Sequence, residues 1–218
     1  MTKQIKTTIA SIVFLLLAIT DVYAVITQNK SLEMIFKPLL MTTLVVVYLV
    51  SVKKPDFWLI SALFFSFWGD VFLLDKANYF VFGLASFLLA HVMYIKMTTQ
   101  FLTNKAVSKI VLAAISFVLL FTGLLFLIFD NLGEMLVPVI VYGITIATFG
   151  ASTLLNYQQE KSTANTWLLL GALLFIASDS LIALNNFYQP KHLFDVSIII
   201  LYVVSQYLIV KAMVAKAG

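Results

Sequence analysis

The sequence predicts an all-α fold, a polytopic bundle of eight transmembrane helices in a single integral membrane domain covering residues 1–218. Hydrophobic residues make up 62% of the 218 residues, and charged residues only 11%. The mean hydropathy is +1.03. Because a soluble domain carries about a quarter charged residues, most of this chain must face lipid. At roughly 20 apolar residues per spanning helix, the length accommodates about eight spans.

Long apolar runs separated by short polar breaks define the eight spans. Each run is about twice as long as the roughly ten-residue strand of a membrane barrel and shows no alternation. The first run follows two lysines, as in a signal peptide, but it is too long for a signal-peptide core, so we interpret it as a span. The expected spans are Thr7–Thr27, Glu33–Val52, Phe57–Leu74, Asn78–Phe101, Val107–Phe129, Gly133–Tyr157, Ala164–Asn186 and Leu193–Met213.

The lysines predict the orientation of the bundle. Ten of the 14 lysines fall on the side of the N-terminus, and four fall on the other side. The positive-inside rule then places both termini in the cytoplasm. The ten are Lys3, Lys6, Lys53, Lys54, Lys96, Lys105, Lys109, Lys161, Lys211 and Lys216, and the four are Lys30, Lys37, Lys76 and Lys191.

A four-plus-four internal duplication is a possible origin of this arrangement. Segment 66–73 of the third span resembles segment 175–182 of the seventh, since each has an aspartate preceded by a small residue. The second and sixth spans each hold a proline, Pro38 and Pro138. Because apolar helices resemble one another by composition, duplication and chance resemblance both remain open.

Asp70 and Asp179 are the two carboxyls that most need an explanation. Both lie late in apolar helices that run in the same direction, roughly 6–12 Å from the outer boundary at 1.5 Å per residue. A charged side chain at membrane depth costs several kcal/mol, so such residues pair, line a wet cavity or take part in chemistry. The alternative is that each hydrogen-bonds across helices and only stabilises packing.

The fourth span carries a face with polar groups. Gly83, Phe87, His91 and Tyr94 are spaced by four, four and three residues, so they share one side of a helix. The small Gly83 allows a neighbouring helix to approach closely. His91 and Tyr94 then point at that neighbour, either as site residues or as satisfied interhelical contacts.

Three further residues are candidates for substrate binding. Tyr202 and Gln206 form a polar stripe on the last span. Lys37 opens the second span from the outer side, as a snorkelling lysine or as a cation placed for a carboxylate or a phosphate headgroup.

Five other acidic residues are expected near water. Asp21 and Glu134 lie close to span ends and are interpreted as boundary residues, with Glu134 in the first turn of its helix. Asp130, Asp195 and Glu160 are expected to face solvent.

Several function classes are disfavoured by composition. The chain has no cysteine and no arginine, so thiolate metal sites are excluded and a nucleic-acid surface is not expected. His91 and His192 are the only histidines and fit no zinc motif. A metal would require Asp70, Asp179 and His91 to converge, and we expect neither a metal nor a cofactor.

The segments around these residues resemble the YhhN-like lysoplasmalogenase family. The resemblance covers most of the chain from the second span to the last, while the first and fifth spans contribute nothing to it. It rests on the segments Lys37–Leu39, Phe67–Leu74, Phe80–Tyr94, Gly171–Leu181 and Tyr202–Gln206, in this order.

The resemblance implies a polytopic membrane hydrolase, placed in the bacterial inner membrane, that cleaves the vinyl-ether bond of lysoplasmalogens or a related lysolipid. The products would be a fatty aldehyde and a glycerophosphoethanolamine or glycerophosphocholine. The implied partners are a lysophospholipid substrate and membrane lipid.

That chemistry requires one carboxylic acid and one carboxylate. Protonation of the enol ether leaves an oxocarbenium ion, which a carboxylate stabilises while water attacks, as in glycosidases. Burial and mutual proximity of two carboxyls separate their pKa values. We therefore expect Asp70 and Asp179 to be the catalytic pair, in either assignment.

The other candidate residues would then assist the pair. His91, Tyr94 and Gln206 would position water or hydrogen-bond the carboxyls, Tyr202 would contact substrate, and Lys37 would meet the headgroup phosphate. The competing interpretations are a proton- or cation-coupled transporter that uses the same aspartates, and a non-enzymatic lipid-binding or scaffold protein.

Overall fold

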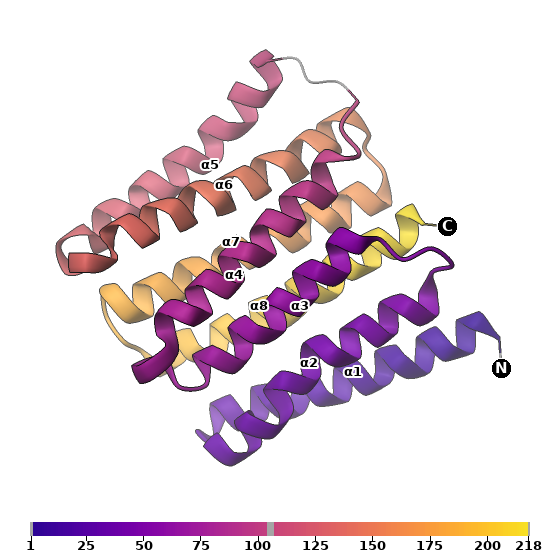
Figure 1. Ribbon diagram of the computed structural model, residues 1–218, viewed down its shortest axis with the longest axis horizontal. Coiled ribbons are helices and arrows are strands. Elements are labelled where there is room, and N and C mark those ends of the chain that lie inside the picture. Colours follow the sequence, from indigo (N-terminus) through magenta and orange to yellow (C-terminus); the bar gives the residue numbers. More distant parts are fainter. Residues whose placement is uncertain (1, 104–106, 218) are drawn as a thin grey trace. The chain divides into compact units, whose positions relative to one another are not determined.

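Eight α-helices make up the part of the chain that the computed structural model describes, residues 2–103 and 107–217, with the backbone alone at 107 and 108 (Figure 1). No strand occurs among these residues. The all-α prediction is therefore confirmed, and Lys105 of the predicted charge pattern lies outside the described residues. The helices are α1 Lys3–Ile26, α2 Lys30–Ser51, α3 Phe57–Leu73, α4 Lys76–Thr99, α5 Val107–Ile128, α6 Leu136–Gln159, α7 Thr163–Phe187 and α8 His192–Lys216.

The lengths and composition of these helices indicate a multi-pass integral membrane protein. Within the described ranges, seven helices are long and apolar enough to cross a membrane. The eighth, α3, is apolar but has 17 residues, at the lower limit of the roughly 17–25 that span a bilayer. The order of the helices agrees with the eight predicted spans and is compatible with a four-plus-four duplication.

Short polar side chains set several helix starts. Asn29, Asp56 and Ser162 precede α2, α3 and α7, and each side chain accepts a hydrogen bond from a backbone N–H in the first turn. Such caps satisfy donors that a helix start leaves open. The helix expected from Gly133 instead begins at Leu136, because Gly133 adopts a φ of +49° and residues Gly133–Met135 form a 3₁₀ turn.

The described chain divides into two compact units. Unit 1 comprises Met1–Tyr94 with Val210–Gly218, and unit 2 comprises Ile95–Ile209. One boundary between the units falls within α4 and the other falls within α8.

Unit 1 is built on the α1–α2 hairpin. Helix α1 packs along α2, and α2 packs on α3. Helices α3 and α4 approach closely through two glycines. A Cβ on Gly69 would come within 2.6 Å of the Phe87 ring, and one on Gly83 within 2.6 Å of Leu73 and 3.6 Å of the Gly69 carbonyl oxygen. The predicted close approach at Gly83 is confirmed.

Unit 2 is built on α5, α6 and α7, which pack in sequence. Helix α8 contacts α7 as well. Gly171 makes the second close approach, since a Cβ there would lie 2.8 Å from Ile209 and 3.0 Å from the Ser205 carbonyl oxygen. A polar network also joins the helices of this unit. Asn156 donates to the carbonyl oxygens of Thr98 and Ser152 at 3.0 and 2.8 Å.

Candidate active site

Asp70 lies in the last turn of α3 and is buried in unit 1. The preceding residue, Gly69, has no side chain, so the Phe87 ring of α4 fits directly against the α3 backbone. Gly83 and Phe87 both face α3, which confirms for these two residues the shared face predicted for α4. Asp70 therefore follows directly, along the chain, on the residue that makes this α3–α4 contact.

His91 and Tyr94 continue along α4 and are both fully buried. His91 Nδ1 donates a hydrogen bond to the Phe87 carbonyl oxygen at 2.8 Å, which assigns the proton of the ring to Nδ1 in this contact. The rings of His91 and Tyr94 pack edge to face with centroids 6.4 Å apart. The histidine is thus held in one orientation by its own helix and by a neighbouring aromatic ring.

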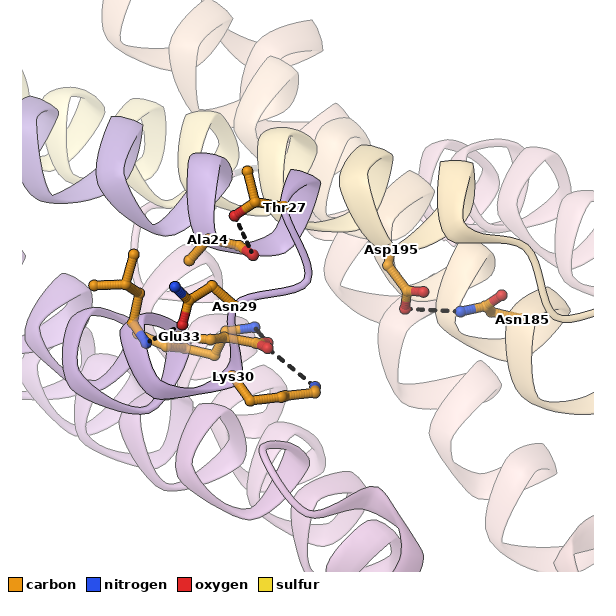
Figure 2. Close-up of polar contacts among 9 residues, drawn as sticks. Ala24, Thr27, Asn29, Lys30, Glu33, Asn185 and Asp195 are labelled. Carbon is orange, nitrogen blue, oxygen red and sulfur yellow. Dashed lines mark hydrogen bonds and ion pairs between the residues drawn. The ribbon is translucent and has the colours of Figure 1, made fainter.

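Lys37 of α2 is a cation of unit 1 that lies near buried acids. Its ammonium group pairs with Glu33 at 2.7 Å, and the two side chains are only 16% and 13% exposed. Glu33 also pairs with Lys30, whose side chain is 72% exposed (Figure 2). The charges of Asp21 and Asp70 act on Lys37 as well. The first two turns of α2 therefore pass from an exposed lysine to a mostly buried ion pair.

Asp21 differs from its predicted place at the boundary. It is 0% exposed, and neither carboxylate oxygen has a hydrogen-bond partner among the described residues. Helix α1 packs along α2, whose Lys37 and Glu33 act on Asp21, while exposed apolar residues such as Leu16 and Ile19 lie elsewhere on α1. The position of Asp21 near the end of its helix was predicted correctly, but its burial inside the protein was not.

Asp179 in unit 2 has a hydrogen-bond partner that the sequence did not reveal. The Tyr142 hydroxyl of α6 donates to the Asp179 carboxylate of α7. Tyr142 lies within an apolar run of α6, where a tyrosine is as common in packing as in a site, so the only sequence signal was a hydroxyl at membrane depth. The next residue, Gly143, carries no side chain and accommodates the Phe121 ring of α5.

Helix α8 contributes Tyr202 and Gln206 to unit 2, and both are buried. The Tyr202 ring packs edge to face on Phe175 at 5.5 Å, one helical turn before Asp179. Ser178 donates to the Ile198 carbonyl oxygen at 3.1 Å, which ties α8 to α7 beside Asp179. The Tyr202 ring predicted for the polar stripe of α8 therefore lies against the helix that carries the second catalytic candidate.

The remaining acidic residues divide by exposure. Asp130, Glu134 and Glu160 are exposed, as expected. Asp195 is only partly exposed, because Asn185 of α7 donates to it at 2.9 Å across the α7–α8 turn (Figure 2). In the described ranges, no three Asp, Glu or His side chains gather closely enough to hold a metal ion.

The segments that build these surroundings match a known protein family. The sequence profile of the YhhN family matches residues 32–213. The chain belongs to the YhhN family. The matched range includes Lys37, Asp70, His91, Asp179 and Gln206, whereas α1 with Asp21 precedes it.

Two curated proteins are also similar to this chain. Proteins named lysoplasmalogenase from Mycobacterium bovis and Mycobacterium tuberculosis are each 33% identical over 135 residues, which cover 60% of this chain. The chain spans about half the length of these relatives, 50% in each case. No solved structure matches this YhhN-family chain.

Proposed function

We propose that this protein hydrolyses the vinyl-ether bond of lysoplasmalogens or closely related lysolipids. The observation that carries the proposal is the presence of two buried carboxyls, Asp70 and Asp179, in membrane helices of a chain similar to proteins named lysoplasmalogenase. A carboxyl in an apolar helix is costly, and the proposed reaction requires two of them.

The reaction proceeds by acid catalysis followed by addition of water. A carboxylic acid donates its proton to the β-carbon of the enol ether, and the resulting oxocarbenium ion is stabilised by a carboxylate. Water adds to the cation and loses a proton to that carboxylate. The hemiacetal then collapses to a fatty aldehyde and a glycerophospho-alcohol. The acid-plus-carboxylate logic is that of glycosidases, whose transition state has the same character.

We assign the two carboxyl roles to Asp70 and Asp179 as a pair, without dividing the roles between them. The Tyr142 hydrogen bond to Asp179 supports a fixed orientation for that carboxylate. In unit 1, the Lys37 charge acts on Asp70. The Tyr142 contact favours a carboxylate held in place before substrate arrives, which is the requirement for electrostatic stabilisation of a developing cation.

The other candidates act on water and substrate. His91, Tyr94 and Gln206 hydrogen-bond water or the carboxyls, and Tyr202 contacts the alkenyl chain. Lys37 meets the headgroup phosphate, since an ammonium group has three N–H donors and Glu33 takes one of them at 2.7 Å.

The location follows from the substrate and from the lysines. A lysolipid is dissolved in the membrane, so a hydrolase embedded in lipid meets it by lateral diffusion. We place the chain, as one membrane domain, in the bacterial inner membrane with both termini in the cytoplasm. The positive-inside rule supports this orientation, because nine of the ten lysines assigned to the cytoplasmic side are described and lie near the helix ends expected on that side.

Release of aldehyde from a lysoplasmalogen by the purified protein is the decisive test. We expect wild-type protein to release it, and Asp70→Asn and Asp179→Asn to lose about 100-fold or more in kcat, because general acid–base catalysis contributes about that much. Asp130→Asn, at an exposed acid, is the matched control. Absence of aldehyde from the wild type, or near-normal turnover in either variant, contradicts the proposal.

A further inference from the structure

Asp21 is a buried carboxyl that the proposed reaction does not use. It is 0% exposed, and neither of its oxygens has a hydrogen-bond partner among the described residues. It belongs to the buried face of α1, together with Phe14, Ala18 and Val25 at helical spacing. A carboxylate in such surroundings is costly unless an opposite charge lies nearby, so the charges beside this face decide what Asp21 does.

The charged groups that act on Asp21 lie on the next helix. Asp21 is about 7–8 Å from the end of α1, while Glu33 and Lys37 are about 4–5 Å and about 10–11 Å from the start of α2, at 1.5 Å rise per residue. Only residues 27–29 connect the two helices, and α1 packs along α2. The hairpin therefore places Asp21 at a level between Glu33 and Lys37, and the charges of both act on it.

The two lysines at the start of α2 share a single glutamate. Glu33 Oε2 pairs with Lys30 at 3.0 Å, and Glu33 Oε1 pairs with Lys37 at 2.7 Å. When all three groups are ionised, one positive charge is left without a counter-charge. The Lys30 side chain is 72% exposed, so water screens its charge, whereas the Lys37 side chain is only 16% exposed. The missing negative charge is therefore needed mainly at Lys37.

Asp21 is placed to supply this negative charge. The charges of Asp21 and Asp70 both act on Lys37, that of Asp21 more strongly. Asp70 also has another interaction of its own. The charges that act on Asp21 are those of Lys37 and Glu33, and only Lys37 has the opposite sign. With Asp21 ionised, the two lysines at the start of α2 are balanced by two carboxylates.

We propose that Asp21 is the counter-charge of the Lys37 ammonium group in the substrate-free protein, and that a substrate phosphate competes with Asp21 for it. The second part rests on the proposed function, which assigns the headgroup phosphate to Lys37. Asp21 is then a positioning residue, because it acts through Lys37 rather than on the reacting atoms. Since α1 precedes the range 32–213 that matches the YhhN family, a helix outside that range supports a residue inside it.

A double-variant cycle in Tm tests the charge pairing without any substrate. Asp21→Asn leaves Lys37 without its counter-charge, and Lys37→Met leaves a buried carboxylate alone, so each single variant is expected to lower Tm. The double variant Asp21→Asn/Lys37→Met removes both charges and is expected to have a higher Tm than either single variant. Additive losses in Tm overturn the inference. Where a single variant does not fold, a folded double variant supports the pairing and an unfolded one overturns it.

The matched control cycle uses the lysine that water screens. Asp21→Asn is combined with Lys30→Met, at the side chain that is 72% exposed, and the two changes in Tm are expected to add. Equal recovery of Tm in both cycles would show that only the total charge of the protein matters, which overturns a specific pairing of Asp21 with Lys37.

The competition with phosphate is measured from KM and kcat for aldehyde release from a 1-alkenyl lysophospholipid. Removal of Asp21 leaves the Lys37 charge to the phosphate, so Asp21→Asn is expected to lower KM about threefold with kcat within about twofold. In the Lys37→Met background, Asp21→Asn should leave KM unchanged. Because damage to the structure alone would lower Tm and raise KM, a raised KM overturns the competition, as does a loss of kcat as large as that of Asp70→Asn.

The two measurements separate this inference from the proposed function. A recovered Tm in the double variant, without aldehyde release by the wild type, leaves Asp21 as the counter-charge of Lys37 and removes the reaction. Aldehyde release by the wild type, with additive losses of Tm in the Lys37 cycle, leaves the reaction and removes the counter-charge.

Discussion

Asp70 and Asp179 occupy similar sequence motifs but different surroundings. Asp179 accepts a hydrogen bond from a tyrosine on the neighbouring helix, whereas Asp70 lies in the field of a lysine that is itself paired with Glu33. A hydrogen bond can fix the orientation of a carboxylate, and a nearby cation balances its charge. Two carboxyls that look equivalent along the chain therefore have different neighbours, a lysine in unit 1 and a tyrosine in unit 2.

The largest expected effect tests whether the two carboxyls act in one reaction. The double variant Asp70→Asn/Asp179→Asn is expected to be only slightly slower than either single variant, each of which loses about 100-fold or more in kcat, because residues that act as a unit have non-additive effects. The measurement is kcat for aldehyde release with matched Tm values. Fully multiplicative losses would show that the two aspartates act independently.

The next effect tests the hydrogen bond that distinguishes unit 2. Tyr142→Phe removes the donor to Asp179 and is expected to lower kcat about tenfold to hundredfold with little change in KM, since loss of one hydrogen bond to a charged group costs about 1.5–3 kcal/mol. Tyr157→Phe on the same helix is the control. A change in KM alone, or an equal loss in the control, would assign Tyr142 to packing.

A similar effect is expected for the cation that distinguishes unit 1. Lys37→Met removes the cation near Asp21 and Asp70, and KM for phospho-headgroup lysolipids should rise about fivefold to tenfold, because an ion pair of partly buried groups is lost. Lys30→Met, at a side chain 72% exposed, should change KM little. The two KM values together separate a specific contact from general attraction to anionic lipid.

The smallest effect concerns stability rather than catalysis. Asn156→Ala removes hydrogen bonds to the Thr98 and Ser152 carbonyl oxygens, and the expected loss is about 1 kcal/mol of unfolding free energy, as for other interhelical hydrogen bonds in membranes. Asn186→Ala removes only a bond within its own helix, to the Ile182 carbonyl oxygen, and serves as the control. Thermal unfolding in detergent measures both. A large loss of kcat in folded Asn156→Ala protein would contradict a purely structural role.

Much of the fold could be predicted because the relevant signal is local. Helix bounds follow from where apolar runs stop and capping residues begin, as at Asn29 and Asp56. The predicted starts Thr7, Glu33 and Gly133 differ by about one turn from the helix starts Lys3, Lys30 and Leu136, although the apolar segment long enough to span a membrane does begin at Gly133. The burial of Asp70, His91 and Asp179 was also predictable, since each lies inside an apolar run.

The partners of these residues could not be predicted in the same way. Tyr142 and Asp179 are brought together by the packing of α6 on α7, and nothing in either segment alone indicates the hydroxyl–carboxylate pair. The burial of Asp21 could not be predicted from the sequence either. Its distance from the helix end indicated a boundary, but the direction in which its side chain points depends on the α1–α2 contact.

The sequence by itself determined that this is a membrane protein, that it is helical, and that carboxyls lie inside its apolar segments. Transfer of a segment into lipid is close to a sum over its residues, so composition along the chain is sufficient. Only the tertiary structure decided which groups meet across helices: Tyr142 meets Asp179, whereas Asp21 has no hydrogen-bond partner among the described residues. Contacts of this kind depend on the rotation and separation of packed helices, and those are properties of pairs of segments rather than of either one.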